Sequence, residues 1–255
     1  MDVLNVSNLS ISIQGKELIR GVSFSLREGD ALLLSGSNGI GKSTLLKSIL
    51  RLEREGKKVT GSIKEKDFGE ILSLDEREIQ KFRASVAYIQ QRDDYAEMGN
   101  IQVRDIISES RESRSGHAYS YSEVNDLIDE WIPRRKDGKR VFDAKSKPAK
   151  FSGGEQRLLS VLSVVATRPD SNLMIIDEPL NNLDYVNARN ISNLINKVIK
   201  NNPQMAMLMI SHCRIFPFIN REIRLESNGV SEIKENYVCH SCFGEHDKDG
   251  FYPLE

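Results

Sequence analysis

The chain has 255 residues, a formal net charge of −1 and 39% apolar residues. This length allows one large domain or two small ones with a substantial core. The near-neutral charge gives no general attraction to nucleic acid or anionic lipid, and no run of about 18 apolar residues could cross a membrane. Three cysteines are too few for a disulfide framework and suit a reducing compartment. No basic region followed by an apolar stretch opens the chain, so we expect no signal peptide.

The first thirty residues alternate apolar and polar side chains, which predicts strands with one buried face. The alternating apolar residues are Leu9, Ile11 and Ile13, then Val22, Phe24 and Leu26. Gly15 and the segment 28–30 are turn signals between strands. Residues 31–34 (Ala-Leu-Leu-Leu) form an apolar run suited to a buried strand, and a helix is expected over 45–50.

Residues 36–44 carry the pattern G-x-x-x-x-G-K-S, which predicts a loop that holds the phosphates of a nucleotide. Its glycines permit tight turns and close approach of the backbone to an anion, and its N–H groups point positive charge at the anion. We expect Lys42 to reach the β- and γ-phosphates and the Ser43 hydroxyl to ligate Mg²⁺. The nucleotide-binding residues predicted are Gly36, Ser37, Asn38, Gly39, Ile40, Gly41, Lys42, Ser43 and Thr44.

Later segments alternate between strand-like and helix-like patterns, which predicts a mostly parallel α/β sheet. The strands expected are 59–63, 86–89, 173–176 and 206–210, and the helical patterns are 100–131, 155–167 and 187–200. The interval 133–150 is polar and basic. The strand at 173–176 ends in Asp177 and Glu178, a position from which one carboxylate can hold Mg²⁺ and the other can activate water.

Residues 151–156 (Phe-Ser-Gly-Gly-Glu-Gln) precede a predicted helix and leave two interpretations open. Ser152 and the free N–H groups of the helix start can form a second anion-binding site. Alternatively, Ser152 only caps the helix and the two glycines only permit the turn.

With these segments in order, the chain resembles the ABC-type ATPases, the nucleotide-binding cassettes of ABC transporters and their soluble relatives, from about residue 3 to about residue 233. Residues 151–156 are similar to the family's L-S-G-G-Q signature, with Phe for Leu and Glu for the first Gln. Pro179 fits the family's D-E-P, and Leu183-Asp184 fits its D-loop. His212 matches the switch histidine, and Gln91, or Gln90 beside it, matches the Q-loop glutamine.

The resemblance implies a P-loop NTPase fold of the ABC-cassette type. Its α/β architecture has a mixed sheet core, an N-terminal antiparallel β subdomain and a helical subdomain. We expect the ATPase domain over 1–235, the helical subdomain at approximately 92–152, and a polar tail containing Cys and His over 236–255.

The resemblance also implies how the residues act. Two cassettes, as a homodimer or heterodimer, hold ATP between residues 36–44 of one chain and Ser152, Gly153, Gly154 and Glu155 of the other. Ser43, Asp177 and Gln91 organise Mg²⁺. Glu178 is the general base, His212 contacts the γ-phosphate, and Asp184 couples the two sites. A monomer is therefore expected to hydrolyse ATP poorly.

One position departs from the family pattern. An aromatic residue usually stacks on the adenine, and alignment of the first hairpin places Ile13 there. Because stacking on an aromatic ring contributes about 1–3 kcal/mol, we expect weak base selectivity, with GTP competing with ATP.

The partner of the cassette is open between three interpretations. The resemblance favours the ATP-binding subunit of a transporter, cytoplasmic and held at the membrane through a separate permease. A soluble ATPase of the iron–sulfur-assembly kind has a similar Phe-Ser-Gly-Gly-Glu signature. A nucleic-acid-directed or defence ATPase would use a basic run, which is more often a solvated loop: Arg134, Arg135, Lys136, Lys139, Arg140, Lys145, Lys147 and Lys150.

The tail carries a Cys-x-x-C pair, Cys239 and Cys242, with His240 and His246 nearby. Thiolates and imidazoles are zinc ligands. The pattern leaves open a Zn²⁺ site or a polar tail without metal, and we favour the latter.

Overall fold

The computed structural model describes residues 1–52, 55–91, 95, 98–116, 118–135, 137–181, 183–211, 216–226 and 229–235. These fall into two compact units. The first comprises Met1–Val86, Ser171–Glu178 and the described residues from Pro203 onward, and the second comprises Ala87–Asp170 and Pro179–Asn202. No helix in the described ranges is long and apolar enough to span a bilayer. The domain boundaries expected from the sequence stay predictions.

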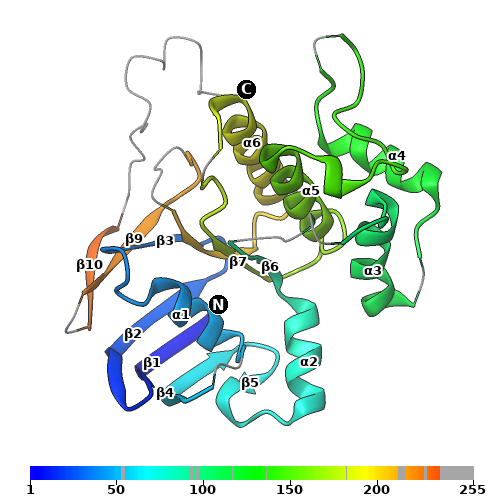
Figure 1. Cartoon of the computed structure of the whole chain (residues 1–255). Helices are drawn as coiled ribbons and strands as arrows, with labels where there is room; N and C mark the ends of the chain where they lie inside the picture. The colour runs from blue at the N-terminus through cyan, green and yellow to red at the C-terminus, as the bar shows by residue number, and fades with distance from the viewer. Residues whose placement is uncertain are drawn as a thin grey trace. The chain divides into compact units, whose positions relative to one another are not determined.

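The first unit opens with an antiparallel sheet in the order β2-β1-β4-β5. Its strands are β1 (Asp2–Ile13), β2 (Lys16–Arg27), β4 (Lys57–Glu65) and β5 (Gly69–Glu70). The predicted alternation is confirmed, because Leu9, Ile11 and Val22 are fully buried. Figure 1 shows these strands together in blue and cyan.

The second sheet of this unit carries the buried strands expected from the apolar runs. In the order β10-β9-β3-β8-β7 lie β10 (Gly229–Glu235), β9 (Arg221–Glu226), β3 (Ala31–Ser35), β8 (Ala206–Ile210) and β7 (Leu173–Asp177). Strands β9, β3, β8 and β7 run parallel to one another, and β10 pairs with β9 antiparallel. The sheet is therefore mixed, as the resemblance implied.

The helices of the first unit are α1 (Lys42–Ile49) and α2 (Glu76–Ser85), with a 3₁₀ turn at Ile71–Ser73. Helix α2, β9 and β10 were not predicted from the sequence. The signal for α2 is a capping box in which Asp75 and Glu78 each accept a backbone N–H of the other. Its apolar side is short, because Ile79 and Phe82 are its only buried residues.

The second unit is mainly helical. It contains the short strand β6 (Ala87–Ile89), α3 (Val103–Ser115), α4 (Tyr121–Trp131), a 3₁₀ turn at Pro148–Lys150, α5 (Gly153–Val165) and α6 (Tyr185–Asn201). The helical pattern predicted over 100–131 is two helices. The Arg104 guanidinium donates to Tyr119 O at 2.8 Å, and Tyr119 N donates to Ser108 Oγ at 3.0 Å, which ties the start of α4 to α3.

Candidate nucleotide site

The phosphate loop joins the end of β3 to the start of α1, the strand–loop–helix context that its sequence predicts. Gly41 caps α1 with φ 110°, a left-handed conformation that favours glycine. Gly36 has φ 140°, and a Cβ atom at this position would lie 2.7 Å from Leu225 O. The loop therefore requires glycine for its conformation at Gly41 and for both conformation and space at Gly36.

Lys42 is the first residue of α1, and its side chain lies folded onto the loop. It is 7% exposed, and its Nζ donates to Gly36 O at 2.8 Å and Ser37 O at 3.0 Å. Burial lowers the pKa of Lys42, while the carboxylates of Glu178 and Asp177 raise it and offset part of that shift. A phosphate bound to this loop would compensate the buried charge.

Ser43 and Asp177 meet although 134 positions separate them. The Ser43 hydroxyl donates to Asp177 Oδ1 at 3.0 Å. Asp177 is fully buried at the end of β7, and the pairing of Asp177 with Ile210 fixes the position of that strand end. A hydroxyl and a carboxylate are hard oxygen ligands of the kind that Mg²⁺ prefers.

Glu178 follows β7 in a backbone conformation that is rare for a residue with a side chain. Its φ is 47°, and its N–H donates to Ile210 O at 2.9 Å. Left-handed conformations of residues other than glycine cost about 1–3 kcal/mol and concentrate at functional sites. The end of β7 is thus held against the neighbouring strand at the two predicted catalytic carboxylates.

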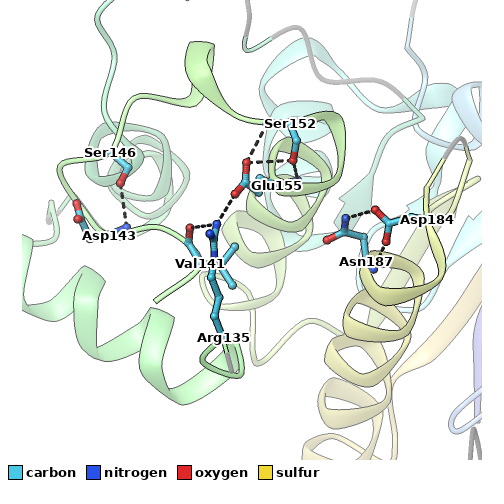
Figure 2. A network of polar contacts seen from close by, with 8 residues as sticks. All are labelled: Arg135, Val141, Asp143, Ser146, Ser152, Glu155, Asp184 and Asn187. Atoms are coloured by element: carbon cyan, nitrogen blue, oxygen red, sulfur yellow. Dashed lines mark hydrogen bonds and ion pairs between the residues drawn. The ribbon is translucent and has the colours of Figure 1, made fainter. Parts of the chain in front are cut away.

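The signature residues lie at the start of α5, in the second unit. Ser152 caps the helix: Glu155 N donates to Ser152 Oγ at 3.3 Å, and Ser152 N donates to Glu155 Oε2 at 2.9 Å. Figure 2 shows this reciprocal pair at the helix end. Ser152 therefore caps α5, and its role in binding an anion stays a prediction. Phe151 stacks on Phe142 with ring centroids 5.1 Å apart, which gives the Phe in this signature an aromatic partner.

Asp184 and the signature are connected through Asn187. Asp184 caps α6 by accepting Asn187 N at 2.9 Å, and its Oδ2 accepts the Asn187 amide at 2.8 Å (Figure 2). The same amide packs against the signature, since a Cβ at Gly154 would lie 2.2 Å from Asn187 Nδ2. Only glycine leaves room for Asn187 at this point.

Gln90 and Gln91 follow β6 in the second unit. The buried Arg157 of α5 donates from Nη1 to Gln90 O and from Nε to Pro179 O, the latter at 3.0 Å. One guanidinium therefore joins the segment that ends in Gln91 to the residue that follows Glu178. His212, Cys239, His240, Cys242 and His246 lie outside the described residues.

Three residues of this site were not identified from the sequence: Arg157, Arg135 and Asn187. Arg157 gave little signal, because it follows the polar residues Glu155 and Gln156 at the start of α5 and directly precedes the buried Leu158 and Leu159. Arg135 was singled out from the sequence only as part of the basic run, and Asn187 was not singled out, since the contacts of Arg135 with Glu155 and of Asn187 with the position of Gly154 depend on packing between segments.

Four residues of the predicted basic run, Arg134, Arg135, Lys139 and Arg140, are paired with acidic groups. Arg134 and Arg140 both bind Asp129, at 2.9 and 2.6 Å, and Lys139 lies 3.4 Å from Asp137. These ion pairs lower the pKa of Asp129, chiefly through the hydrogen bond from Arg140. Arg135 pairs with Glu155 at 2.6 Å.

The fold and the phosphate loop define a P-loop nucleotide-binding protein, and comparison with known proteins gives its family. Residues 19–181 match the ABC transporter family, and the chain belongs to that family. It is an ATP-binding and ATP-hydrolysing cassette.

The relatives include ATP-binding proteins of two import systems. The chain is 31% identical over 217 residues to the metal-staphylopine import system ATP-binding protein CntD of Staphylococcus aureus, covering 83% of this chain and 77% of the relative. It is 28% identical over 214 residues to the phosphate import ATP-binding protein PstB of Saccharolobus solfataricus, covering 83% and 79%. Among solved structures, the dimeric bacterial ABC transporter cassette MJ0796 shares the fold with a TM-score of 0.72 at 19% identity, over 92% of this chain and 99% of that one.

Proposed function

We propose that this cassette is the ATP-binding subunit of an ABC transporter, that two cassettes close around two ATP molecules, and that a separate permease holds them at the cytoplasmic face of a membrane. The observation that carries the ATP site is the contact between Ser43 and Asp177. It joins the start of the phosphate-loop helix to the strand that ends in two carboxylates. Membership of the ABC transporter family supports the transport role, as do the two relatives named as import-system proteins.

The nucleotide site fits a complex of Mg²⁺ with ATP. Residues 36–44 surround the phosphates, and Lys42 exchanges its two carbonyl partners for phosphate oxygens. Ser43 and Asp177 would hold Mg²⁺, and the family resemblance assigns Gln91 to the same ion. When bound, Mg²⁺ would supply positive charge that stabilises the charge developing on the γ-phosphate.

We assign hydrolysis to three residues that follow β6, β7 and β8 in the sequence. Glu178 takes the proton of the attacking water, Gln91 helps to orient that water, and His212 contacts the γ-phosphate. In the closed dimer, Ser152, Gly153, Gly154 and Glu155 of the second cassette face the same phosphate, and Asp184 couples the two sites. The contact of Asn187 with Asp184 and Gly154 supports this coupling, because the two motifs share one side chain.

The other interpretations of the partner are weaker. The ion pairs of Arg134, Lys139 and Arg140 support a structural role for the basic run rather than nucleic-acid binding.

For the tail, we propose no bound zinc. Metal analysis of protein purified without a His tag tests this, and near-stoichiometric Zn²⁺ would contradict it.

The test of the transporter role uses tagged Glu178→Gln, which should bind ATP without hydrolysing it. The proteins that co-purify with it from membrane and soluble fractions are then identified. Recovery of a polytopic membrane protein in stoichiometric amount is the expected result. The control is Glu178→Gln combined with Lys42→Ala, which should not form the ATP-bound dimer. Recovery of only soluble proteins or nucleic acid from both fractions would reject the transporter role, and the ATPase assignment would stand.

A further inference from the structure

The signature of this chain has a carboxylate, Glu155, in the first turn of α5. The inference rests on the proposed sandwich dimer, in which that turn of α5 faces the γ-phosphate of the nucleotide bound to the other cassette. A carboxylate and a polyphosphate repel one another, and the helix end has a limited number of N–H donors to share between them. The site therefore needs something that offsets the charge of Glu155.

Glu155 already occupies the donors that an incoming phosphate would use. Its Oε2 accepts Ser152 N at 2.9 Å and the Ser152 hydroxyl at 3.0 Å. The hydroxyl proton of Ser152 is thus directed at Glu155. For the Ser152 hydroxyl to donate to a phosphate, its hydrogen bond to Glu155 has to break. The Glu155 carboxylate then needs another hydrogen-bond donor.

Arg135 provides that partner. Its Nη2 donates to Glu155 Oε1 at 2.6 Å and to Val141 O at 3.1 Å, and Figure 2 shows the guanidinium between the two. The contact with Val141 anchors the guanidinium independently of Glu155. Arg135 comes from the polar segment before the signature, 20 positions from Glu155.

We propose that Arg135 is a positioning residue for the ATP site: it neutralises Glu155 and holds that carboxylate aside, which leaves Ser152 and the start of α5 able to bind the phosphate of the opposing nucleotide. Arg135 acts through Glu155 and touches no nucleotide itself. Its loss therefore matters only while residue 155 carries a negative charge.

The test is ATP-dependent dimerisation of the Glu178→Gln protein, measured by analytical ultracentrifugation as the ATP concentration for half-maximal dimer. Arg135→Ala should raise that concentration about fivefold at low salt, and the effect should shrink at about 0.5 M salt, because half-exposed charges are screened. Adding Glu155→Gln to Arg135→Ala should return the value to within about twofold of Glu155→Gln alone.

The matched control is Arg134→Ala. Arg134 is the neighbouring arginine, with the same charge and nearly the same exposure (53% against 51%), but it binds Asp129. It should leave dimerisation unchanged. If the defect of Arg135→Ala persists in the Glu155→Gln background, or equals that of Arg134→Ala, the positioning role is wrong. Failure of Glu178→Gln itself to dimerise with ATP would instead reject the sandwich dimer, and this inference with it.

Discussion

Single side chains set the chemistry of the phosphate loop, and Lys42 shows how. In the free protein its ammonium is buried and held by two carbonyl groups, and burial lowers its pKa. Because the folded-state pKa lies below the unfolded value, folding is relatively disfavoured at low pH, and stability rises as pH increases between the two values. A bound polyphosphate has the opposite effect, since it favours the charged form.

We therefore predict that nucleotide binding takes up protons at alkaline pH. Affinity should fall as the pH rises through the lowered pKa of Lys42, below the ordinary lysine range. The measurement is calorimetric titration with nucleotide between about pH 7 and pH 10 in two buffers of different ionisation enthalpy. Lys42→Ala, which binds more weakly, should show no such proton uptake. If affinity fell with pH equally steeply in the wild-type protein and in Lys42→Ala, the assignment of the proton uptake to Lys42 would be wrong.

Arg157 is predicted to stabilise both the fold and the catalytic segments. Arg157→Met leaves the carbonyls of Gln90 and Pro179 without this donor. Of the two, the bond to the Pro179 carbonyl is buried, and an unsatisfied buried carbonyl costs about 1–3 kcal/mol. The free energy of unfolding in urea should therefore fall by about that amount. The ATPase rate should fall about tenfold, because Gln91 and Glu178 adjoin these carbonyls. Arg157→Lys should have a free energy of unfolding and an ATPase rate between those of the wild type and Arg157→Met. Wild-type stability and activity in Arg157→Met would show that the bridge is dispensable.

Base selectivity is predicted to be weak at Ile13. This half-buried residue ends β1, opposite Lys16 of β2 and Lys57 of β4. An aliphatic side chain offers only apolar contact to a base, so the dissociation constants of ATP and GTP should agree within about threefold. Ile13→Tyr should tighten ATP binding about fivefold or more, since stacking contributes about 1–3 kcal/mol. A strong preference of the wild-type protein for ATP would overturn this prediction.

At the scale of elements, the starts of α5 and α6 are linked by hydrogen bonding and packing. Ser152 and Asp184 cap the two helices, and Asn187 links Asp184 to Gly154. The absence of a side chain at Gly154 permits this contact. A substitution at the start of either helix should therefore disturb the structure at the start of the other.

We predict that Gly154→Ala destabilises the protein by about 1–3 kcal/mol, the usual cost of overpacking. The new methyl group displaces the amide of Asn187 and breaks its bond to Asp184. Chemical denaturation measures the effect. Gly153→Ala is the matched control, because a Cβ there meets nothing within 4 Å, and its stability should not fall. Combining Gly154→Ala with Asn187→Ala should recover most of the lost free energy of unfolding, because the smaller side chain leaves room for the new methyl group. If the losses of the two single variants add in the double variant, the contact between Gly154 and Asn187 is not the cause.

At the scale of the whole molecule, the proposed function divides each ATP site between two cassettes. The phosphate loop and the signature belong to different units of the chain, and the resemblance places each opposite the other motif of a second copy. A single cassette then holds only half of each site.

We predict that the specific ATPase activity rises with protein concentration. Below the dissociation constant of the dimer, the rate should scale with about the square of the cassette concentration, by mass action. Steady-state assays over about a hundredfold range of concentration test this. Glu178→Gln at the same concentrations gives the background rate. A specific activity that is constant over the whole range would show that the monomer is competent or that the dimer is permanent.

The fold was predictable where local pattern and burial agree. Strands β1, β2, β3, β7 and β8 were expected from alternating or continuous apolar residues, and α5 and α6 from helical periodicity. Helix α2 was missed because it is mostly charged and buries only Ile79 and Phe82. Strands β9 and β10 were missed because charged and polar residues separate their few apolar residues, so the sequence showed no clear strand pattern. Strand β9 forms by pairing with β3, and β10 by pairing with β9, which are both tertiary contacts.

The sequence by itself determined the chemistry of this protein. The phosphate loop, the strand ending in Asp177 and Glu178, and the signature are contiguous segments whose spacing sets which donors and ligands they offer. Tertiary structure alone decided which of these groups meet. Ser43 reaches Asp177 through the ordering of β3, β8 and β7, and Arg157 bridges two loops from within α5. Arg135 pairs with Glu155, and Asn187 lies against Gly154, because separate segments pack together. Such contacts depend on register and packing, which no local pattern encodes.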